Sequence, residues 1–380
     1  MKNILFIHQS SELYGSDKTL LLLLTHLDRL LFNPIVVLPS EGPLKSELEK
    51  INIKVVIAPV LKLYRNMFSF KNMIQFYKDY KKAINILDTI NKEYTIDVVY
   101  SNTLAVLLGM IYSRKRQIKH IWHVHEIIVH PKSIANIFPK LLLRYADLVI
   151  CNSYATQNNL TQRAPNLVNK SIVIHNGIET NETSISYKNK EDFGFSSSDI
   201  VITLVGRISR LKGHKWFLNT FIDYLDKLED INVLFVGSPV VGQEFYLKEV
   251  EEIIISNKLE KRIKIIPFTS DLNAIWKNTD IAVMPSTEAE SFGLVAAEAM
   301  LAQKPVIASN HGGLTEIIVH NKSGILVEPN NKAELYEAIL KLKSNPDLRV
   351  KLGDNGRKRI LAEFSLEKYI QNITDSIKHI

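Results

Sequence analysis

The chain has 380 residues, 46% of them hydrophobic, which predicts two domains with buried cores and excludes a disordered protein. Its one cysteine, Cys151, excludes a disulfide framework within the chain and indicates a cytoplasmic protein, and no apolar run reaches the roughly 20 residues that a membrane span needs. The net charge of +7 is concentrated in residues 1–180, with 22 Lys/Arg against 13 Asp/Glu (+9), whereas residues 181–380 have 25 against 27 (−2).

The first predicted element is a strand over residues 3–8, which leads through a short loop to an apolar helix. The loop contains a single glycine, Gly15, where the backbone can approach a ligand closely, but it lacks the three-glycine fingerprint of dinucleotide-binding proteins. A plainer interpretation is that Ser16 or Asp17 caps the following helix.

Further apolar runs in the first half are typical of buried parallel strands. They cover residues 35–38, 55–58, 98–100, 121–124, 148–151 and 172–174. The stretch from Leu61 to Leu87 mixes lysines with aromatic residues, as amphipathic helices on anionic membranes do, and Ile134 to Tyr145 adds a second apolar and basic stretch. Core-packed helices with solvated lysines explain this pattern equally well. An anionic membrane surface is one candidate partner, whereas no motif indicates a nucleic-acid partner.

Polar residues follow several of these strands. In the segment His123-Val124-His125-Glu126 the two histidines share one face of the strand and Glu126 points the other way. The spacing suggests no third or fourth ligand, so we favour structural histidines over a metal site and expect no metal. Other polar residues at strand ends are Asn102, Ser153 and Asn176. Each is a candidate turn or cap residue, but all fall where a ligand-binding cleft is expected.

The polar segment 181–199 is the predicted linker, and a second series of strands begins after it. These strands cover residues 200–205, 233–236, 263–266, 281–284, 306–308 and 325–327. Two successive series of alternating strands and helices predict an α/β protein with two Rossmann-like, doubly wound domains, 1–180 and 200–356, that face a central cleft. The apolar spacing in residues 357–380 predicts a terminal packing helix.

A basic loop, Gly206 to Gly213, follows the first strand of the second domain. Gly206 permits close approach of a ligand, Arg207 offers a planar fork for phosphate oxygens, and Lys212 supplies a point charge. Taken alone, the segment is most simply a solvated basic turn. Because two carboxylates follow in the same half of the chain, we favour a diphosphate site.

Those carboxylates, Glu290 and Glu298, belong to a loop and helix that follow the strand 281–284. The helix is expected from Phe292 onward, with Glu290 just before it and Glu298 about two turns inside. A helix N-terminus at the carboxyl end of a parallel strand receives anions through its backbone N–H groups, and carboxylates accept hydrogen bonds from neutral hydroxyls. The combination suits a nucleotide sugar.

Together these motifs resemble glycosyltransferase family 4, the metal-independent retaining enzymes of the GT-B fold. The resemblance covers essentially the whole chain. Its most specific part is Pro285-Ser286…Glu290-Ser291-Phe292-Gly293-Leu294…Glu298, supported by Gly206-Arg207…Lys212-Gly213 and by Asn176-Gly177. The chain departs from the family near its start, where Gly15-Ser16-Asp17 replaces a pair of glycines. Its family histidine is His125 or His123.

The resemblance implies specific roles. Arg207 and Lys212 would bind the donor diphosphate, Glu298 the ribose hydroxyls and Glu290 the hydroxyls of the transferred sugar, with His125 beside the anomeric carbon. The remaining donor-binding residues would be Gly15, Ser153, Asn176, Gly206, Phe292, Gly293 and Leu294. The first domain would bind the acceptor, and the helix over 357–380 would pack back onto it.

The expected activity is transfer of a hexose-type sugar from a UDP- or GDP-sugar to a hydroxyl of a saccharide or lipid-linked acceptor, with retention and without a cofactor. The Lys, Ile and Asn richness suggests an AT-rich bacterial source and a role in envelope polysaccharide synthesis, in the cytoplasm or at the inner face of the membrane. The alternatives are a non-catalytic GT-B subunit that binds nucleotide or a partner, and a sugar-nucleotide epimerase.

Overall fold

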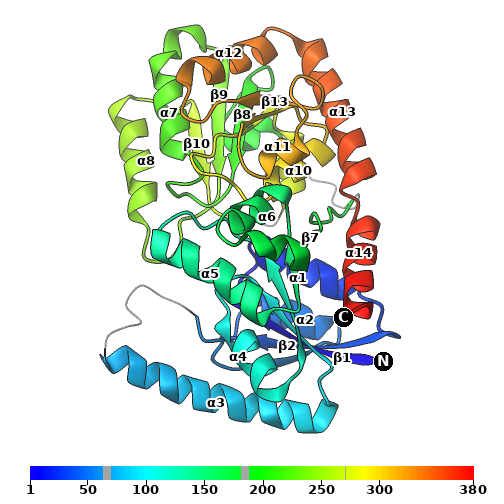
Figure 1. Ribbon diagram of the computed structural model, residues 1–380. Helices are drawn as coiled ribbons and strands as arrows, with labels where there is room; N and C mark the ends of the chain where they lie inside the picture. The colour runs from blue at the N-terminus through cyan, green and yellow to red at the C-terminus, as the bar shows by residue number, and fades with distance from the viewer. Residues whose placement is uncertain (63–69, 181–187, 270) are drawn as a thin grey trace. The chain divides into compact units, whose positions relative to one another are not determined.

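The computed structural model describes residues 1–62, 70–180, 188–269 and 271–380, and the chain divides into two compact units (Figure 1). The first unit comprises Met1–Gly177 together with Leu366–Ile380, and the second comprises Ile178–Ser365. Each unit is built on one parallel sheet with helices on both faces, which is the arrangement that the two series of strands predict.

The first unit contains a seven-stranded sheet in the order β3-β2-β1-β4-β5-β6-β7. Its strands are β1 (Lys2–His8), β2 (Phe32–Leu38), β3 (Lys54–Ile57), β4 (Val98–Asn102), β5 (Lys119–Val124), β6 (Leu148–Cys151) and β7 (Ser171–Val173). All neighbouring strands are parallel, and the register pairs His8 with Asn102 and Asn102 with His123. Polar residues that are far apart in the sequence therefore become neighbours at the carboxyl edge of this sheet.

Helices cover both faces of this sheet because successive strand residues point to opposite sides. The helices are α1 (Gly15–His26), α2 (Pro43–Lys50), α3 (Phe70–Tyr94), α4 (Leu107–Arg116), α5 (Lys132–Tyr145), α6 (Tyr154–Thr161) and α14 (Leu366–Lys378). On one face Leu5 and Ile7 join a core with residues of α3, α4 and α5. On the other face Ile4 and Phe6 join a core with residues of α1, α2 and α14.

The second unit contains a six-stranded parallel sheet in the order β10-β9-β8-β11-β12-β13. Its strands are β8 (Ile200–Val205), β9 (Ile231–Val236), β10 (Ile263–Ile266), β11 (Ile281–Met284), β12 (Val306–Ser309) and β13 (Ile325–Val327). The helices are α7 (His214–Asp223), α8 (Phe245–Ser256), α9 (Leu272–Lys277), α10 (Leu294–Leu301), α11 (Leu314–Ile317), α12 (Lys332–Lys343) and α13 (Pro346–Glu363).

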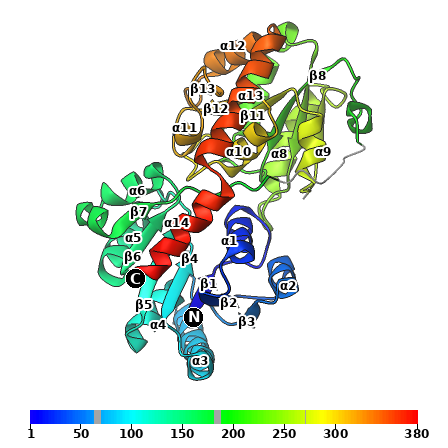
Figure 2. The same ribbon diagram turned by 90° about the vertical axis from the view of Figure 1, so that its right-hand side faces the viewer.

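The C-terminal region is two helices, not the single helix expected over residues 357–380. The helix α13 ends at Glu363, and Ile178 N–H donates to the carbonyl of Phe364 (2.9 Å) where the chain leaves the second unit. Burial explains the break, since Ile360 and Phe364 pack in a core of the second unit whereas the apolar residues of α14 pack in the first. The division therefore falls at Leu366, and α14 lies across the first sheet (Figure 2).

The expected linker, residues 181–199, lies partly outside the described residues, which omit 181–187. Its described part belongs to the second unit. Residues Lys190–Phe193 form a 3-10 turn, and the Lys190 ammonium lies 2.7 Å from Asp280 Oδ2 and 2.6 Å from the carbonyl of Asp199. The segment that follows residue 187 is thus a packed part of a domain and not a free connection.

Candidate active site

Three loops meet at the carboxyl edge of the second sheet. They follow β8 (residues 206–213), β11 (residues 285–293) and β12 (residues 310–313). Thr287 N–H donates to the carbonyl of Leu211 (2.9 Å), and Gly313 N–H donates to the carbonyl of Glu290 (2.7 Å). The loop after β11 is therefore held by its backbone between the two others, which fixes the position of the carboxylate that it carries.

Glycines make this close approach of backbones possible. A Cβ at Gly213 would lie 1.8 Å from the carbonyl oxygen of Pro285, and one at Gly312 would lie 2.4 Å from the carbonyl oxygen of Glu290. Both glycines also have positive φ, +76° and +61°. Side chains at these two positions would push the three loops apart.

Lys212 and Glu290 form the centre of the cluster. The Lys212 ammonium lies 2.8 Å from Glu290 Oε1, to which the Ser286 hydroxyl also donates, and the two charged side chains are only 27% and 18% exposed. Burial alone would raise the pKa of Glu290, but Lys212, Ser286 and His311 together hold it below its ordinary value. Glu290 is therefore an ionised acceptor of hydrogen bonds at neutral pH. The sequence placed both residues in one site but did not predict their direct pairing.

The other predicted donor-binding residues of the second unit lie on the same loops or on α10. Arg207 is exposed, Glu298 is half-buried in the second turn of α10, and Gly206 has a φ of +154° beside the methylenes of Lys212. The helix α10 begins at Leu294, two residues later than expected, because Gly293 has a φ of +106°. Glu298 consequently lies only about one turn inside the helix.

Phe292 contributes a core side chain. It is 2% exposed and packs edge-on against Phe364, with ring centroids 5.9 Å apart. The side chain of Phe292 is therefore part of the core, and the contact of its backbone with a donor stays a prediction. The first backbone N–H groups of α10 have no carbonyl partner within the helix, which makes this end of the helix suited to an anion.

In the first unit, His125 follows β5 and is 8% exposed. Its Nε2 lies 2.9 Å from Asn102 Oδ1, while Glu126 Oε2 accepts the backbone N–H groups of His125 (3.1 Å) and Leu104 (3.0 Å). Glu126 thus holds the backbone of its neighbour, and because β5 ends at Val124, strand alternation does not decide the direction of its side chain. Burial lowers the pKa of His125 well below its ordinary value, and His123 and His8 lower it further, so the ring is neutral at neutral pH.

His123 is a core residue within β5. The hydroxyl of Tyr100 lies 2.8 Å from its Nδ1, and the ring is fully buried beside that of His125, with centroids 3.9 Å apart. Burial lowers the pKa of His123 to about 3. It supports its neighbour by packing, as expected for a structural histidine.

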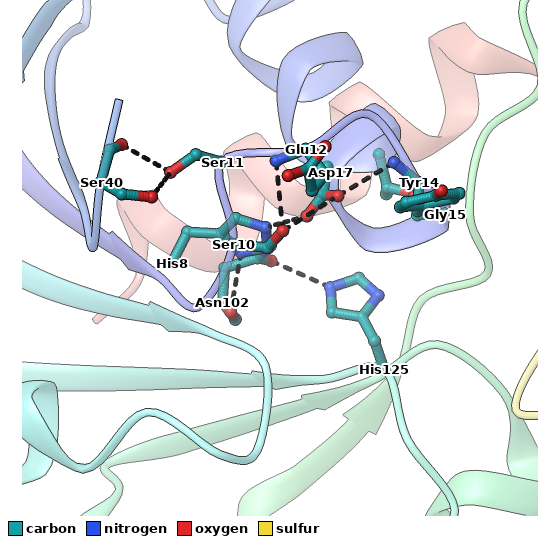
Figure 3. Close-up of polar contacts among 11 residues, drawn as sticks. His8, Ser10, Ser11, Glu12, Tyr14, Gly15, Asp17, Ser40, Asn102 and His125 are labelled. Carbon is teal, nitrogen blue, oxygen red and sulfur yellow. Dashed lines mark hydrogen bonds and ion pairs between the residues drawn. The ribbon is translucent and has the colours of Figure 1, made fainter. Parts of the chain in front are cut away.

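Two buried residues of this cluster were not predicted as site residues. His8 Nε2 lies 2.6 Å from Asp17 Oδ1, and His8 Nδ1 lies 3.0 Å from both the side-chain Nδ2 and the backbone carbonyl oxygen of Asn102. Asp17, His8, Asn102 and His125 therefore form one row of contacts (Figure 3). Asp17 also accepts the N–H of Tyr14 (2.9 Å) in the first turn of α1, which is close to its expected capping role. The signal for His8 in the sequence was a histidine at the end of a buried strand. Its partner Asp17 lies nine residues further along the chain, after a loop.

The remaining predicted residues of the first unit have different environments. Gly15 is the first residue of α1, and a Cβ added there would meet no atom within 4 Å. Ser153 is the N-cap of α6 and accepts the N–H of Thr156 (2.9 Å), so it has a structural role. Asn176 is 4% exposed, and its Oδ1 accepts no hydrogen bond from the described residues.

Two kinds of feature are absent from the described residues, a metal-binding cluster and a membrane-spanning helix. In this part of the chain, no group of three or more His, Cys, Asp or Glu side chains is arranged to hold a metal ion. The helices outside the omitted ranges 63–69, 181–187 and 270 include none that is both long and apolar enough to span a bilayer.

Comparison with known proteins places both halves of the chain in one group. The family model described as Glycosyltransferase Family 4 matches residues 14–182, and that described as Glycosyl transferases group 1 matches residues 186–359. An uncharacterized glycosyltransferase of Methanocaldococcus jannaschii is 31% identical over 312 residues, which cover 80% of each chain. The capsular polysaccharide biosynthesis glycosyltransferase CapM of Staphylococcus aureus is 25% identical over 322 residues, covering 80% of this chain and 83% of CapM.

Among solved structures, HepE of Anabaena in complex with UDP-glucose superimposes with a TM-score of 0.85, at 25% identity and with full coverage of both chains. Two Rossmann-like parallel sheets with this similarity define a glycosyltransferase of the GT-B type, which confirms the predicted fold class. The chain belongs to glycosyltransferase family 4. Its activity is sugar transfer.

Proposed function

We propose that the protein transfers a hexose-type sugar from a UDP- or GDP-sugar to a hydroxyl of a saccharide or lipid-linked acceptor, with retention of the anomeric configuration. The observation that carries the proposal is the buried Lys212–Glu290 pair beside the N-terminus of α10. A nucleotide sugar has both anionic phosphates and neutral hydroxyls, and this cluster contains groups suited to each. The similar protein HepE was solved with UDP-glucose.

Each part of the donor has a matching group on the second unit. Arg207 and Lys212 supply positive charge for the diphosphate, and the N-terminal N–H groups of α10 supply further donors. Glu290 is ionised and accepts hydrogen bonds from hydroxyls of the transferred sugar, while Glu298, about one turn into the helix, accepts those of the ribose. The donor would displace the ammonium of Lys212 from Glu290 toward its own phosphate.

The reaction that fits these groups is a front-face substitution. The bond between the anomeric carbon and the diphosphate oxygen breaks, the acceptor oxygen bonds to the same face of that carbon, and the acceptor proton passes to the leaving phosphate. Arg207, Lys212 and the helix dipole stabilise the charge that grows on the diphosphate. Since these groups perform the work that a metal ion does elsewhere, we expect no metal or other cofactor, and transfer in excess EDTA should proceed at the untreated rate.

The proposal also includes a role in envelope polysaccharide synthesis and an anionic membrane surface as a partner. The similar protein CapM is named for capsular polysaccharide biosynthesis. In the first unit, Met73, Ile74 and Tyr77 of α3 are 45–56% exposed beside lysines of the same helix, as on a helix that lies on anionic lipid at the cytoplasmic face. The aromatic and basic residues at positions 63–69 lie outside the described residues. Co-sedimentation with anionic vesicles at low salt tests this, and absence of binding would remove the membrane partner.

The donor is identified by screening. Thermal shift against a panel of UDP- and GDP-sugars, followed by assay of nucleotide release, should single out one donor that both stabilises the protein and is slowly hydrolysed. The product formed with an added acceptor should have the donor's anomeric configuration by NMR. An inverted product, or a panel of UDP- and GDP-sugars that neither binds nor releases nucleotide, would contradict the proposal.

A further inference from the structure

The two members of the Lys212–Glu290 pair are held in unequal ways. The backbone of Glu290 is fixed because its carbonyl accepts the N–H of Gly313 (2.7 Å), and its Oε1 also receives the Ser286 hydroxyl. The ammonium of Lys212 lies 2.8 Å from the same Oε1, at the end of a flexible four-carbon chain. When the pair opens, we therefore expect the ammonium to move and the carboxylate to stay in place.

The side chain of Lys212 also lies against the loop that is proposed to receive the diphosphate. A Cβ added at Gly206 would be 3.4 Å from Cδ and 3.5 Å from Cε of Lys212, so these methylenes lie beside the Gly206 backbone. Arg207, the other proposed phosphate ligand, is the next residue in the chain. The ammonium of Lys212 therefore has two acceptors within its reach, the Glu290 carboxylate and an anion bound at this loop.

A bound diphosphate competes with Glu290 for this one ammonium. Burial acts to raise the pKa of Glu290, and Lys212, together with Ser286 and His311, holds that pKa below its ordinary value. A diphosphate that draws the ammonium away leaves a mostly buried carboxylate without its counter-ion and beside new negative charge, which is unfavourable. Neutral hydroxyls that donate to the carboxylate offset this loss without adding charge.

We propose that the Lys212–Glu290 pair makes the site select the complete donor over the nucleoside diphosphate that remains after transfer. A nucleoside diphosphate takes Lys212 from Glu290 and supplies no group to the carboxylate, whereas a nucleotide sugar brings the hydroxyls of its sugar. The product is therefore bound more weakly than the donor and leaves the site readily. This inference rests on the proposed function, because it requires a site for a nucleotide sugar.

An isosteric substitution that removes only the charge of Glu290 tests the proposal. In Glu290→Gln no carboxylate competes for the ammonium of Lys212, which can then bind a diphosphate without leaving a buried charge behind. We expect UDP or GDP to bind about tenfold more tightly to Glu290→Gln than to the wild type, measured by isothermal titration calorimetry of the full chain. An unchanged or weaker affinity in the folded variant overturns the proposal, because Lys212 would then serve both groups at once.

The preference for the complete donor should depend on the same carboxylate. In the wild type we expect the nucleotide sugar that the screen identifies to bind about tenfold more tightly than its nucleoside diphosphate, and in Glu290→Gln we expect this preference to disappear. The neutral amide accepts hydrogen bonds from sugar hydroxyls less strongly than the carboxylate does. A wild-type protein that binds the nucleoside diphosphate at least as tightly as the nucleotide sugar overturns the proposal even if no variant folds.

Glu288→Gln is the matched control, because it removes the same charge from the same loop. Glu288 pairs with Arg210, and the two side chains are 39% and 63% exposed, so this carboxylate is solvated and does not hold Lys212. Its affinity for UDP or GDP should stay within about twofold of the wild type. Equal tightening in Glu288→Gln and Glu290→Gln would show a general effect of lower negative charge and would overturn the proposal.

A double-mutant cycle with Lys212→Met isolates the competition for the ammonium. Without the ammonium, Glu290 and the diphosphate no longer compete for one counter-ion, so Glu290→Gln should tighten nucleoside diphosphate binding less than about threefold in this background. An equal gain with and without Lys212 overturns the proposal. If UDP and GDP bind neither the wild type nor Glu290→Gln, the proposed function fails and this inference with it. Binding to both without the tightening removes the inference alone.

Discussion

Glu290 stays ionised because it forms a mostly buried ion pair with Lys212. Lys212 and Ser286 both contact its Oε1, and the loop hydrogen bonds hold the carboxylate where it is. Removing the ammonium leaves a buried carboxylate without its counter-ion, which costs far more than loss of an exposed pair. The geometry therefore makes the pair important to stability as well as to donor binding.

Lys212→Met keeps the methylenes and removes the charge, so we expect a loss of about 1–3 kcal/mol in the free energy of unfolding at neutral pH. The pKa of Glu290 is lowered in the wild type, so the contribution of the pair is complete above the ordinary carboxyl pKa and is lost as pH falls through the lowered one. The difference between the two proteins should therefore shrink in acid. Urea unfolding across this pH range measures it.

Lys215→Met is the matched control. Lys215 pairs with Glu249 at 3.1 Å, but both side chains are more than 40% exposed. This variant should stay within about 0.5 kcal/mol of the wild type at all these pH values. Equal losses at positions 212 and 215 would show that the Glu290 pair has no special stability.

Single residues mark the limit of prediction from sequence. Lys212 and Glu290 were predicted for one site because each sits in a distinctive motif after a strand. The pairing of His8 with Asp17 was not predicted. An aspartate in the first turn of a helix is typical of a cap, and nothing in the local pattern indicates which strand residue its other oxygen contacts. The role of Glu126 was not predicted for a related reason: it lies two residues past the end of β5 at Val124, where strand alternation no longer applies.

At the scale of elements, the loops of the second unit depend on how closely their backbones approach. Gly213→Ala brings a methyl group within 1.8 Å of the Pro285 carbonyl and also places alanine at a φ of +76°. We expect a loss of at least about 3 kcal/mol in the free energy of unfolding, with weaker donor binding because the loops separate. Thermal unfolding with and without donor measures both effects.

Gly242→Ala separates the two causes of that loss. Gly242 has a φ of +82°, but an added Cβ would meet no atom within 4 Å. This variant should lose only the conformational cost, about 1 kcal/mol, and bind donor normally. Equal losses in the two alanine variants would contradict a role for close contact between the loops.

The strands of both sheets were predictable because they are short, continuous apolar runs with polar or glycine-rich flanks. The boundaries of the helices were less predictable than the strands. The N-terminal shift of α10 depends on the positive φ of Gly293, and the break between α13 and α14 depends on which core each apolar residue enters. The spacing of apolar residues in the sequence continues without a break through Phe364. The residues before and after Phe364 fit one helical pattern, although they pack in different units.

At the scale of the whole molecule, the C-terminal helix completes the domain that the N-terminus begins. Tyr369, Ile373 and Ile377 of α14 are at most 2% exposed and share a core with Ile4 and Phe6 of β1. A Cβ at Gly177 would lie 2.7 Å from that of Tyr369, so the chain passes closely over this helix where the first unit ends. The first unit therefore requires the last residues of the chain.

Tyr369→Ala should reduce the free energy of unfolding of the first unit by about 3–5 kcal/mol, because it leaves a cavity in this core. Tyr369→Phe should be neutral or stabilising by up to about 1 kcal/mol, since the buried hydroxyl has no hydrogen-bond partner among the described residues. Urea denaturation of the full chain measures both. A Tyr369→Phe variant as unstable as Tyr369→Ala would contradict this packing.

The account as a whole depends on nucleotide-sugar chemistry at Lys212 and Glu290. The most direct measurement is the transfer rate of Lys212→Ala and of Glu290→Ala with the donor that the screen identifies, in protein shown to be folded. We predict that each variant loses at least about tenfold in kcat, because each removes a charged contact to the donor in the transition state. Rates within about threefold of the wild type in both variants would contradict the assignment of this site.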